Sequence, residues 1–217
     1  MVRAADVLVF LDDVQYTRRD WRNRNLIRGA SGTRWLTIPV SSKGQFHANI
    51  SEIEISDSGW RRSHLSILEH TYGHYAFYQN LHPDIASMYE ETSRDTKLSV
   101  VNQRMTLNLF RLLDIQVEVY DSSEFTVHND PSERLAAICL ELNACTYVTG
   151  PAARSYLREE AFEQCGLTIE WIDYGQLPPI PKDQDTGKEL SILDILSTSD
   201  LPTSQRLSTF VSSSDTA

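Results

Sequence analysis

The order of short apolar runs and longer amphipathic segments after residue 116 constrains the fold of this chain most strongly. Three runs have the length and residue types of strands, and they lie at residues 116–121, 146–150 and 168–173. The segments between them have the features of helices. A β-α-β-α-β order requires right-handed crossover connections, and it therefore predicts a parallel sheet.

Both of the intervening segments carry signals for where a helix begins or ends. In the first, Asp130 suits the N-cap, Pro131 the first helical position and Glu133 the third. The second is expected to run from Pro151 to near Gly166, because a glycine commonly terminates a helix. The helix signals therefore agree with the positions of the predicted strands.

The first half of the chain opens with a nearly continuous apolar run at residues 5–12, which is typical of a strand buried on both faces. Other elements are predicted from their periodicity: strands at residues 35–40 and 50–55, and helices at residues 60–72, 84–94, 98–113 and 190–196. The last of these helices follows a loop with several prolines and glycines at residues 175–188.

The predicted architecture is an α/β fold with a mostly parallel sheet, helices on both faces and a Rossmann-like three-layer arrangement. We expect a single domain over residues 1–197, because a chain of 217 residues with 41% hydrophobic residues can bury one large core. Residues 198–217 have little apolar content, and they are expected to form a disordered tail.

Arginine is strongly preferred over lysine in this chain, which has 16 arginines among its 20 basic residues. Six arginines and a single acid, Asp20, lie between residues 18 and 34, whereas the whole chain has a net charge of -10. Planar guanidinium groups suit bidentate recognition of phosphate or carboxylate. The alternative is a basic surface patch that pairs with the acidic remainder. The net charge argues against the broad basic surface of a nucleic-acid-binding protein.

The segment that follows the first predicted strand combines aromatic rings, guanidinium groups and amides. Its candidate substrate-binding residues are Gln15, Tyr16, Arg18, Arg19, Trp21, Arg22, Asn23 and Arg24. Such a set is typical of a site for a sugar or nucleotide that carries phosphate. The alternative is an amphipathic loop in which Tyr16 and Trp21 pack inward.

Ligands of open α/β sheets lie beyond the carboxyl ends of the strands, and this rule nominates Asp12 and Asp13 as catalytic candidates. Either could act as a general base or bind a substrate hydroxyl. Adjacent side chains of an extended chain point to opposite faces, so at most one serves a given pocket. The alternative is that both aspartates only end the strand in a turn.

Three further candidates lie elsewhere in the sequence. Gly150 stands between a predicted strand and a predicted helix, where free N–H groups bind anions, and Tyr156 follows in the helix. His64, next to Trp60 on a helical stripe, is either a third catalytic candidate or a packed helix residue.

No metal site is predicted, and the sequence does not identify a cofactor. His64, His70 and His74 lack the spacing and the accompanying carboxylates of a zinc site. The three cysteines have no C-x-x-C spacing and are expected to be free thiols in a reducing compartment. No apolar run is long enough to span a membrane, so a cytoplasmic location is expected.

The longest motif, residues 5–25, resembles the start of the WbqC-like family of bacterial proteins. The resemblance continues through five further stretches in the same order, at residues 35–40, 60–72, 130–139, 147–157 and 190–196. It implies a role in the biosynthesis of O-antigen and other surface polysaccharides, in which an acyl, aminoacyl or nucleotidyl group is transferred to an activated, nucleotide-linked sugar.

This sequence departs from the family pattern at its start. Members usually begin with a His-Gln-Pro-type segment about twenty residues before the strand that opens this chain, and here that segment is absent. Either the start codon is misassigned or the chain is an N-terminally truncated member of the family. Two alternatives to a transferase follow, namely a non-catalytic scaffold protein of a biosynthetic complex and an inactive truncated member.

Overall fold

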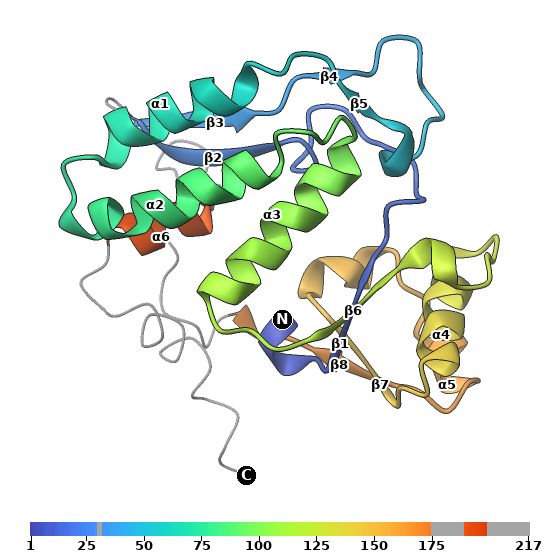
Figure 1. Ribbon diagram of the computed structural model, residues 1–217. Helices are drawn as coiled ribbons and strands as arrows, with labels where there is room; N and C mark the ends of the chain where they lie inside the picture. The colour runs from blue at the N-terminus through green and yellow to red at the C-terminus, as the bar shows by residue number, and fades with distance from the viewer. Residues whose placement is uncertain (30–31, 175–188, 199–217) are drawn as a thin grey trace, which may run out of the picture. The chain divides into compact units, whose positions relative to one another are not determined.

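The computed structural model describes residues 1–29, 32–174 and 189–198 (Figure 1). These residues fall into two compact units. The first unit contains residues 1–13 and 115–174, and the second contains residues 14–114 and 189–198. Each unit is described by itself, and the single domain expected over residues 1–197 stays a prediction.

The first unit contains two pairs of parallel strands. β1 (Val7–Phe10) pairs with β6 (Glu118–Asp121), and β7 (Thr146–Thr149) pairs with β8 (Thr168–Trp171). The connecting helices are α4 (Pro131–Glu141), the 3₁₀ helix η4 (Pro151–Ser155) and α5 (Glu159–Glu163). Two further 3₁₀ helices are η1 (Val2–Ala4) and η3 (Ser122–Glu124). Parallel strand pairing is confirmed, but the described strands form separate two-stranded pairs. The mostly parallel sheet with helices on both faces and the Rossmann-like three-layer arrangement stay predictions.

Two details of this unit differ from the sequence-based expectation. The four residues of β1 are half-buried rather than enclosed on both faces. The helix expected after Pro151 is divided into η4 and α5, because the Arg158 N–H donates to the Ser132 hydroxyl at 3.0 Å instead of continuing a helix. The N-cap prediction is confirmed, since Asp130 accepts hydrogen bonds from two N–H groups of the first turn of α4.

The core of the first unit lies between α4, α5 and the β7–β8 pair. Phe162 is fully buried in it and stacks on Tyr147 with 5.0 Å between the ring centroids. Burial raises the pKa of the Cys139 thiol to about 11, so this cysteine stays protonated and acts as a small apolar side chain. No disulfide joins the cysteines, all three of which lie in the described chain.

The second unit consists of two short antiparallel strand pairs and four α-helices. β2 (Arg24–Gly29) pairs with β3 (Gly32–Thr37), and β4 (Val40–Ser41) pairs with β5 (Glu54–Ile55). The four α-helices are α1 (Trp60–Tyr72), α2 (Ala76–Glu91), α3 (Leu98–Leu112) and α6 (Ile192–Thr198). A 3₁₀ helix, η2 (Ile50–Glu52), precedes β5. Helix α2 packs against α1, α3 and α6 (Figure 1).

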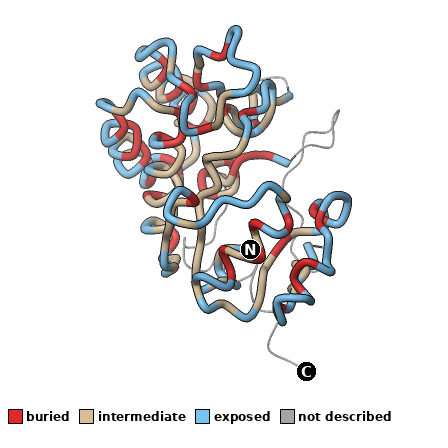
Figure 2. Tube along the Cα trace, turned by 90° about the vertical axis from the view of Figure 1, so that its right-hand side faces the viewer, coloured by how far each residue is buried: buried red, intermediate tan, exposed pale blue. Residues whose placement is uncertain are grey.

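Helices α1 and α3 begin where the periodicity predicts. Helix α2 begins eight residues earlier than residue 84, and Pro83 lies inside it. Its buried stripe runs from Tyr78 to Tyr89 at helical spacing, so burial of this face outweighs the missing N–H of the proline. Figure 2 shows the resulting alternation of buried and exposed segments along the helices.

The strand predicted at residues 35–40 is divided between β3 and β4, and the one at residues 50–55 begins as η2 before β5.

Of the helices described, none combines the length and apolar character that a membrane span needs. The predicted loop at residues 175–188 and all but the first residue of the predicted tail lie outside the described residues.

A buried carboxylate attaches α6 to the β2–β3 hairpin. Asp194 is fully buried and accepts two hydrogen bonds from the Arg28 guanidinium, at 3.0 and 3.1 Å, and one from the Tyr72 hydroxyl at 3.0 Å. The Ser191 N–H donates to the Leu26 carbonyl at 2.7 Å. The short helix predicted at residues 190–196 is confirmed as α6. These contacts fix it to β2 and to α1.

We predict that Arg28→Ala destabilises the protein by about 2 kcal/mol, measured by urea denaturation. The substitution leaves Asp194 buried with only the Tyr72 hydroxyl as donor, and the half-exposed position of Arg28 limits the cost. Arg34→Ala, at an exposed position of the same hairpin, is the control and should stay within about 0.5 kcal/mol of the wild type. If Arg28→Ala and Arg34→Ala lost the same free energy of unfolding, Arg28 would not be an anchor for α6.

Candidate ligand-binding site

The arginine-rich segment before β2 is shaped by Asp20. The Thr17 hydroxyl donates to the Asp20 carboxylate at 2.6 Å, and the Trp21 N–H donates to it at 2.7 Å. These hydrogen bonds, with the Thr17 contribution largest, hold the pKa of Asp20 below its usual value. Arg22 Nε donates to Thr17 Oγ1 at 2.9 Å and lies 3.6 Å from Asp20. The carboxylate therefore orients the turn and the guanidinium of Arg22 together.

Asn23 and Arg24 join this segment to the hairpin. The side-chain amide of the buried Asn23 donates to the Ile38 backbone carbonyl at 2.9 Å. The backbone carbonyl of Asn23 accepts a hydrogen bond from the Ile38 N–H at 2.8 Å. The Arg24 guanidinium lies over the Trp35 ring, 4.2 Å from its centroid, and Trp21 packs against the same ring at 5.1 Å. Arg24 therefore lies over the Trp35 ring at a distance that favours cation–π attraction.

Arg24 has hydrogen-bonding capacity to spare. One terminal nitrogen donates to the Arg19 carbonyl, while Nε is buried and has no partner among the described residues. A buried donor without an acceptor costs about 1–3 kcal/mol.

His64 lies on α1 inside an aromatic cluster with Trp60 and Tyr89. Its Nε2 is 3.0 Å from the Thr37 carbonyl, which can only accept, so this nitrogen carries the hydrogen. Its Nδ1 then accepts from the Tyr89 hydroxyl at 3.3 Å. Burial lowers the pKa of His64 and outweighs the opposing effect of the hydrogen bond to Thr37. The imidazole is therefore neutral, and both of its nitrogens are engaged.

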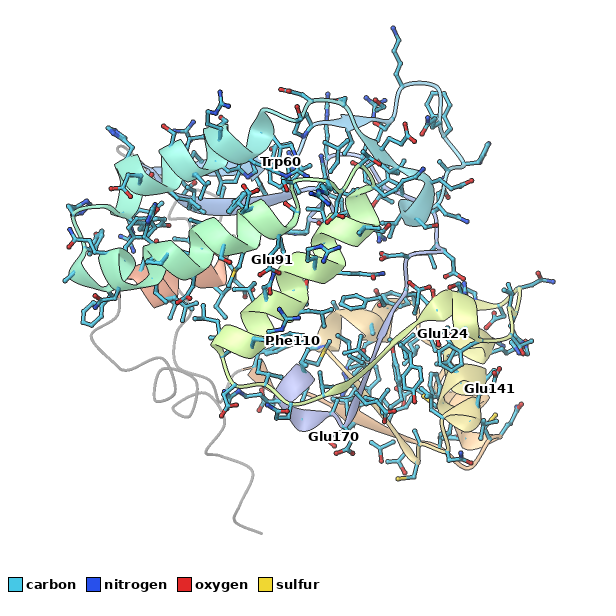
Figure 3. All side chains as sticks on the ribbon, in the orientation of Figure 1. Trp60, Glu91, Phe110, Glu124, Glu141 and Glu170 are labelled. Atoms are coloured by element: carbon cyan, nitrogen blue, oxygen red, sulfur yellow. The ribbon has the colours of Figure 1, made fainter. Side chains whose placement is uncertain are left out.

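These residues border a cavity of about 400 Å³ in the second unit, next to the start of α1, where Figure 3 labels Trp60. Its polar and aromatic lining residues are Trp21, Arg22, Asn23, Arg24, Asn25, Trp60, His64, Tyr89, Asn102, Thr106 and Ser191. Aliphatic side chains and methionines of the hairpin, α2, α3 and α6 complete the lining. A cavity of this size and composition suits a small-molecule ligand.

Five of the predicted site residues meet at this cavity: Trp21, Arg22, Asn23, Arg24 and His64. Four others of the same segment have different surroundings. Gln15 donates to the Phe46 carbonyl at 2.6 Å, and Tyr16 is buried, which raises the pKa of its hydroxyl. Arg18 and Arg19 are exposed, and Arg19 adopts a left-handed backbone with φ 59°. The cavity therefore takes its two guanidinium groups from Arg22 and Arg24.

Asp12 and Asp13 follow β1 in the first unit, as predicted. Asp13 accepts a hydrogen bond from the fully buried Ser122 hydroxyl at 2.6 Å and is ion-paired with the buried Arg134. Burial raises the pKa of the Asp13 carboxyl, but the hydrogen bonds from Ser122 and Arg134 and the charge of Arg134 together lower it below its usual value. This carboxylate joins β1, η3 and α4, which is a structural role.

Gly150 and Tyr156 lie on either side of η4 in the first unit. A Cβ at Gly150 would stand 3.1 Å from the Tyr174 hydroxyl, so a close approach of that side chain explains the glycine. The helix after Gly150 is only a five-residue 3₁₀ helix, which weakens the anion-site interpretation. The Tyr156 side chain is 68% exposed.

Several cavity residues were not found from the sequence, chiefly Tyr89 on α2, Asn102 on α3 and Ser191 before α6. Tyr89 lies on the buried stripe of its helix, a pattern that indicates only core packing. Asn102 donates to the Arg22 carbonyl at 2.8 Å, a contact across 80 residues of sequence that no local pattern reveals. Within the described ranges, no group of three or more His, Cys, Asp or Glu side chains is placed to hold a metal ion.

The fold and the cavity define an α/β protein with a small-molecule-sized pocket lined by arginine and aromatic side chains. A model of the WbqC-like protein family matches residues 1–203, and the chain belongs to this family. It is 36% identical over 174 residues to the uncharacterized protein Rv1507c of Mycobacterium tuberculosis, an alignment that covers 80% of this chain and 75% of the relative. No solved structure matches. The family resemblance seen in the sequence is confirmed.

We predict that Asp13→Ala destabilises the protein by about 3 kcal/mol in urea denaturation, because it leaves the buried Arg134 guanidinium without its carboxylate. Asp6→Ala, at an exposed position just before β1, is the matched control and should change stability by no more than about 0.5 kcal/mol. If Asp13→Ala were as stable as the control, the structural role assigned to Asp13 would be wrong.

A second prediction concerns acid stability. Because the folded pKa of His64 is lowered, the unfolded chain takes up a proton below about pH 6.5 while the folded chain does not. The stability advantage of the wild type over His64→Gln should therefore shrink as the pH falls below 6.5, by about 1.4 kcal/mol for each unit of pKa lowering. Urea denaturation from pH 7.5 to 5 measures this.

The other histidines are common to both proteins in that comparison, so their contributions cancel. His70→Gln, at an exposed position of the same helix, is the control and should follow the wild-type curve. A pH-independent difference between the wild type and His64→Gln would show that His64 is not held neutral by burial.

Proposed function

We propose that the cavity of the second unit binds a nucleotide-linked sugar and that the protein is a transferase acting on this activated sugar in bacterial surface-polysaccharide biosynthesis. The observation that carries the proposal is the composition of the cavity lining. It has two arginines and three aromatic residues, of which Trp21 is exposed, and no acidic residue of the described chain lines it.

Charge supports an anionic ligand at this place. Arg22 and Arg24 are the two positively charged residues among the described residues that line the cavity. A phosphate or diphosphate presents planar pairs of oxygens that match a guanidinium group. The acidic chain as a whole would repel such a ligand elsewhere, so the local arginines also favour entry at this cavity.

Aromatic side chains support a ligand with a flat ring. Trp21 is 49% exposed at the cavity edge, although it packs partly against Trp35. An exposed indole offers a face on which a base can stack, worth about 1–3 kcal/mol. In this proposal Trp21 binds the base, and Arg22 and Arg24 bind the phosphates.

His64 has a positioning role in the proposal rather than that of a general base. Both of its ring nitrogens are hydrogen-bonded within the protein, and its pKa is lowered by burial. It fixes Tyr89 and the end of β3 relative to each other at the cavity wall. The transferred group in this proposal is an acyl, aminoacyl or nucleotidyl group, and the proposed location is the cytoplasm.

The proposal predicts that a UDP-sugar binds in calorimetric titration and that Arg24→Gln weakens this binding at least tenfold. The substitution removes a guanidinium that phosphate oxygens would engage, and tenfold corresponds to about 1.4 kcal/mol. Arg62→Gln, which removes an exposed arginine of α1, is the matched control and should bind within twofold of the wild type.

Two further probes sharpen the experiment. UMP should bind with part of the affinity of the UDP-sugar, because it keeps the base and one phosphate. The free sugar should not displace bound UMP. Trp21→Ala should weaken UMP and UDP-sugar to a similar degree, since both carry the base. Equal binding by the wild type and Arg24→Gln, or loss of binding in Arg62→Gln alone, would contradict the proposed site.

A further inference from the structure

A second cavity, of about 440 Å³, lies in the same unit at the N-terminal end of α1. It is lined by residues from β3, the segment before α1 and the first turns of that helix: Trp35, Leu36, Thr37, Pro39, Asp57, Gly59, Trp60, Ser63, His64 and Ile67. The site described above does not use Asp57 or Ser63, and no sequence motif singled them out.

The two cavities have opposite charge. The first carries Arg22 and Arg24, with no acid in its described lining, whereas the second carries Asp57, with no lysine or arginine in its described lining. A carboxylate without a neighbouring cation repels phosphate and carboxylate groups. The second cavity therefore disfavours the anionic ligand that the first one suits.

The second cavity has the groups that recognise a neutral, polyhydroxylated molecule. The Asp57 carboxylate is fixed by the Gly59 N–H, which donates to Oδ1 at 2.8 Å, and its oxygens are acceptors for hydroxyl groups. Ser63 adds a hydroxyl that can donate or accept. Trp35 is half-buried and supplies apolar ring surface against which a sugar ring can pack, whereas Trp60 is buried at the wall of the cavity.

The two cavities share one wall, because Leu36, Trp60 and His64 line both. Trp60 is only 3% exposed, and its indole N–H has no hydrogen-bond partner among the described residues. A buried donor of this kind is costly unless a ligand or water provides the acceptor.

We propose that the second cavity is a subsite for a neutral saccharide, recognised by Asp57, Ser63 and the ring of Trp35. The saccharide and the anionic ligand then lie on either side of the shared wall. Only this pairing rests on the proposed function. Binding of the saccharide itself depends on the second cavity alone.

The tryptophans provide the readout. Of the four in the chain, Trp21, Trp35 and Trp60 line the two cavities, while Trp171 lies in the first unit under the Arg154 guanidinium. Heteronuclear NMR of protein with ¹⁵N-labelled indoles gives one side-chain signal for each. Assignment uses single Trp→Phe variants, and the titrants are glucose, N-acetylglucosamine and UMP.

We expect glucose or N-acetylglucosamine to shift the signals of Trp35 and Trp60 and to leave Trp171 unchanged. Asp57→Asn should weaken this binding at least fivefold, because the amide accepts fewer hydroxyl hydrogen bonds while it can still accept from the Gly59 N–H. Asp84→Asn, at an exposed position of α2, is the matched control and should bind like the wild type.

The outcomes separate the two proposals. Unmoved signals of Trp35 and Trp60, or equal binding by Asp57→Asn and the wild type, overturn the saccharide subsite whether or not UMP binds. Stronger binding of glucose 6-phosphate than of glucose at these signals also overturns it. Failure of UMP to bind, with saccharide binding intact and sensitive to Asp57→Asn, supports the subsite and overturns only the function proposed for the first cavity.

Discussion

The arrangement of the second unit depends on the ion pair between Arg28 and the fully buried Asp194. Arg28 belongs to β2 and Asp194 to α6, two elements separated by more than 160 residues of sequence. The Tyr72 hydroxyl of α1 donates to the same carboxylate, so three elements are fixed by one side chain. Helix α6 and the residue before it then complete the lining of the first cavity through Ser191, Ile192 and Leu193.

Local signals made much of the fold predictable. The N-cap of α4 at Asp130 and the apolar periodicity of α1 and α3 can be seen within a few residues of sequence, and these three helices were correctly predicted. Helix α2 was predicted too short because Pro83 is a local signal against a helix, whereas the burial that overrides it is tertiary. At residues 50–55 the Asn49–Glu52 capping interaction begins a 3₁₀ helix where apolar alternation indicated only a strand.

The candidate site was predictable only where local composition indicates it. The composition of residues 15–24 indicated an anionic ligand, and Trp21, Arg22, Asn23 and Arg24 do line the first cavity. The sequence could not distinguish these residues from Arg18 and Arg19, because the distinction depends on the turn that Asp20 and Thr17 build. Nor could it reveal that α2, α3 and the start of α6 meet at this place, since no local pattern records contacts across so many residues.

The wall shared by the two cavities has a consequence for how the protein can change. Trp60 lines both cavities and packs against His64 and Tyr89, so its replacement alters two binding surfaces and the aromatic cluster at once. Two ligands that touch a common wall are also linked thermodynamically, and whatever one does to the affinity of the other is reciprocated. If both cavities bind ligands as proposed, a substitution of Trp60 changes substrate preference on both sides of the wall.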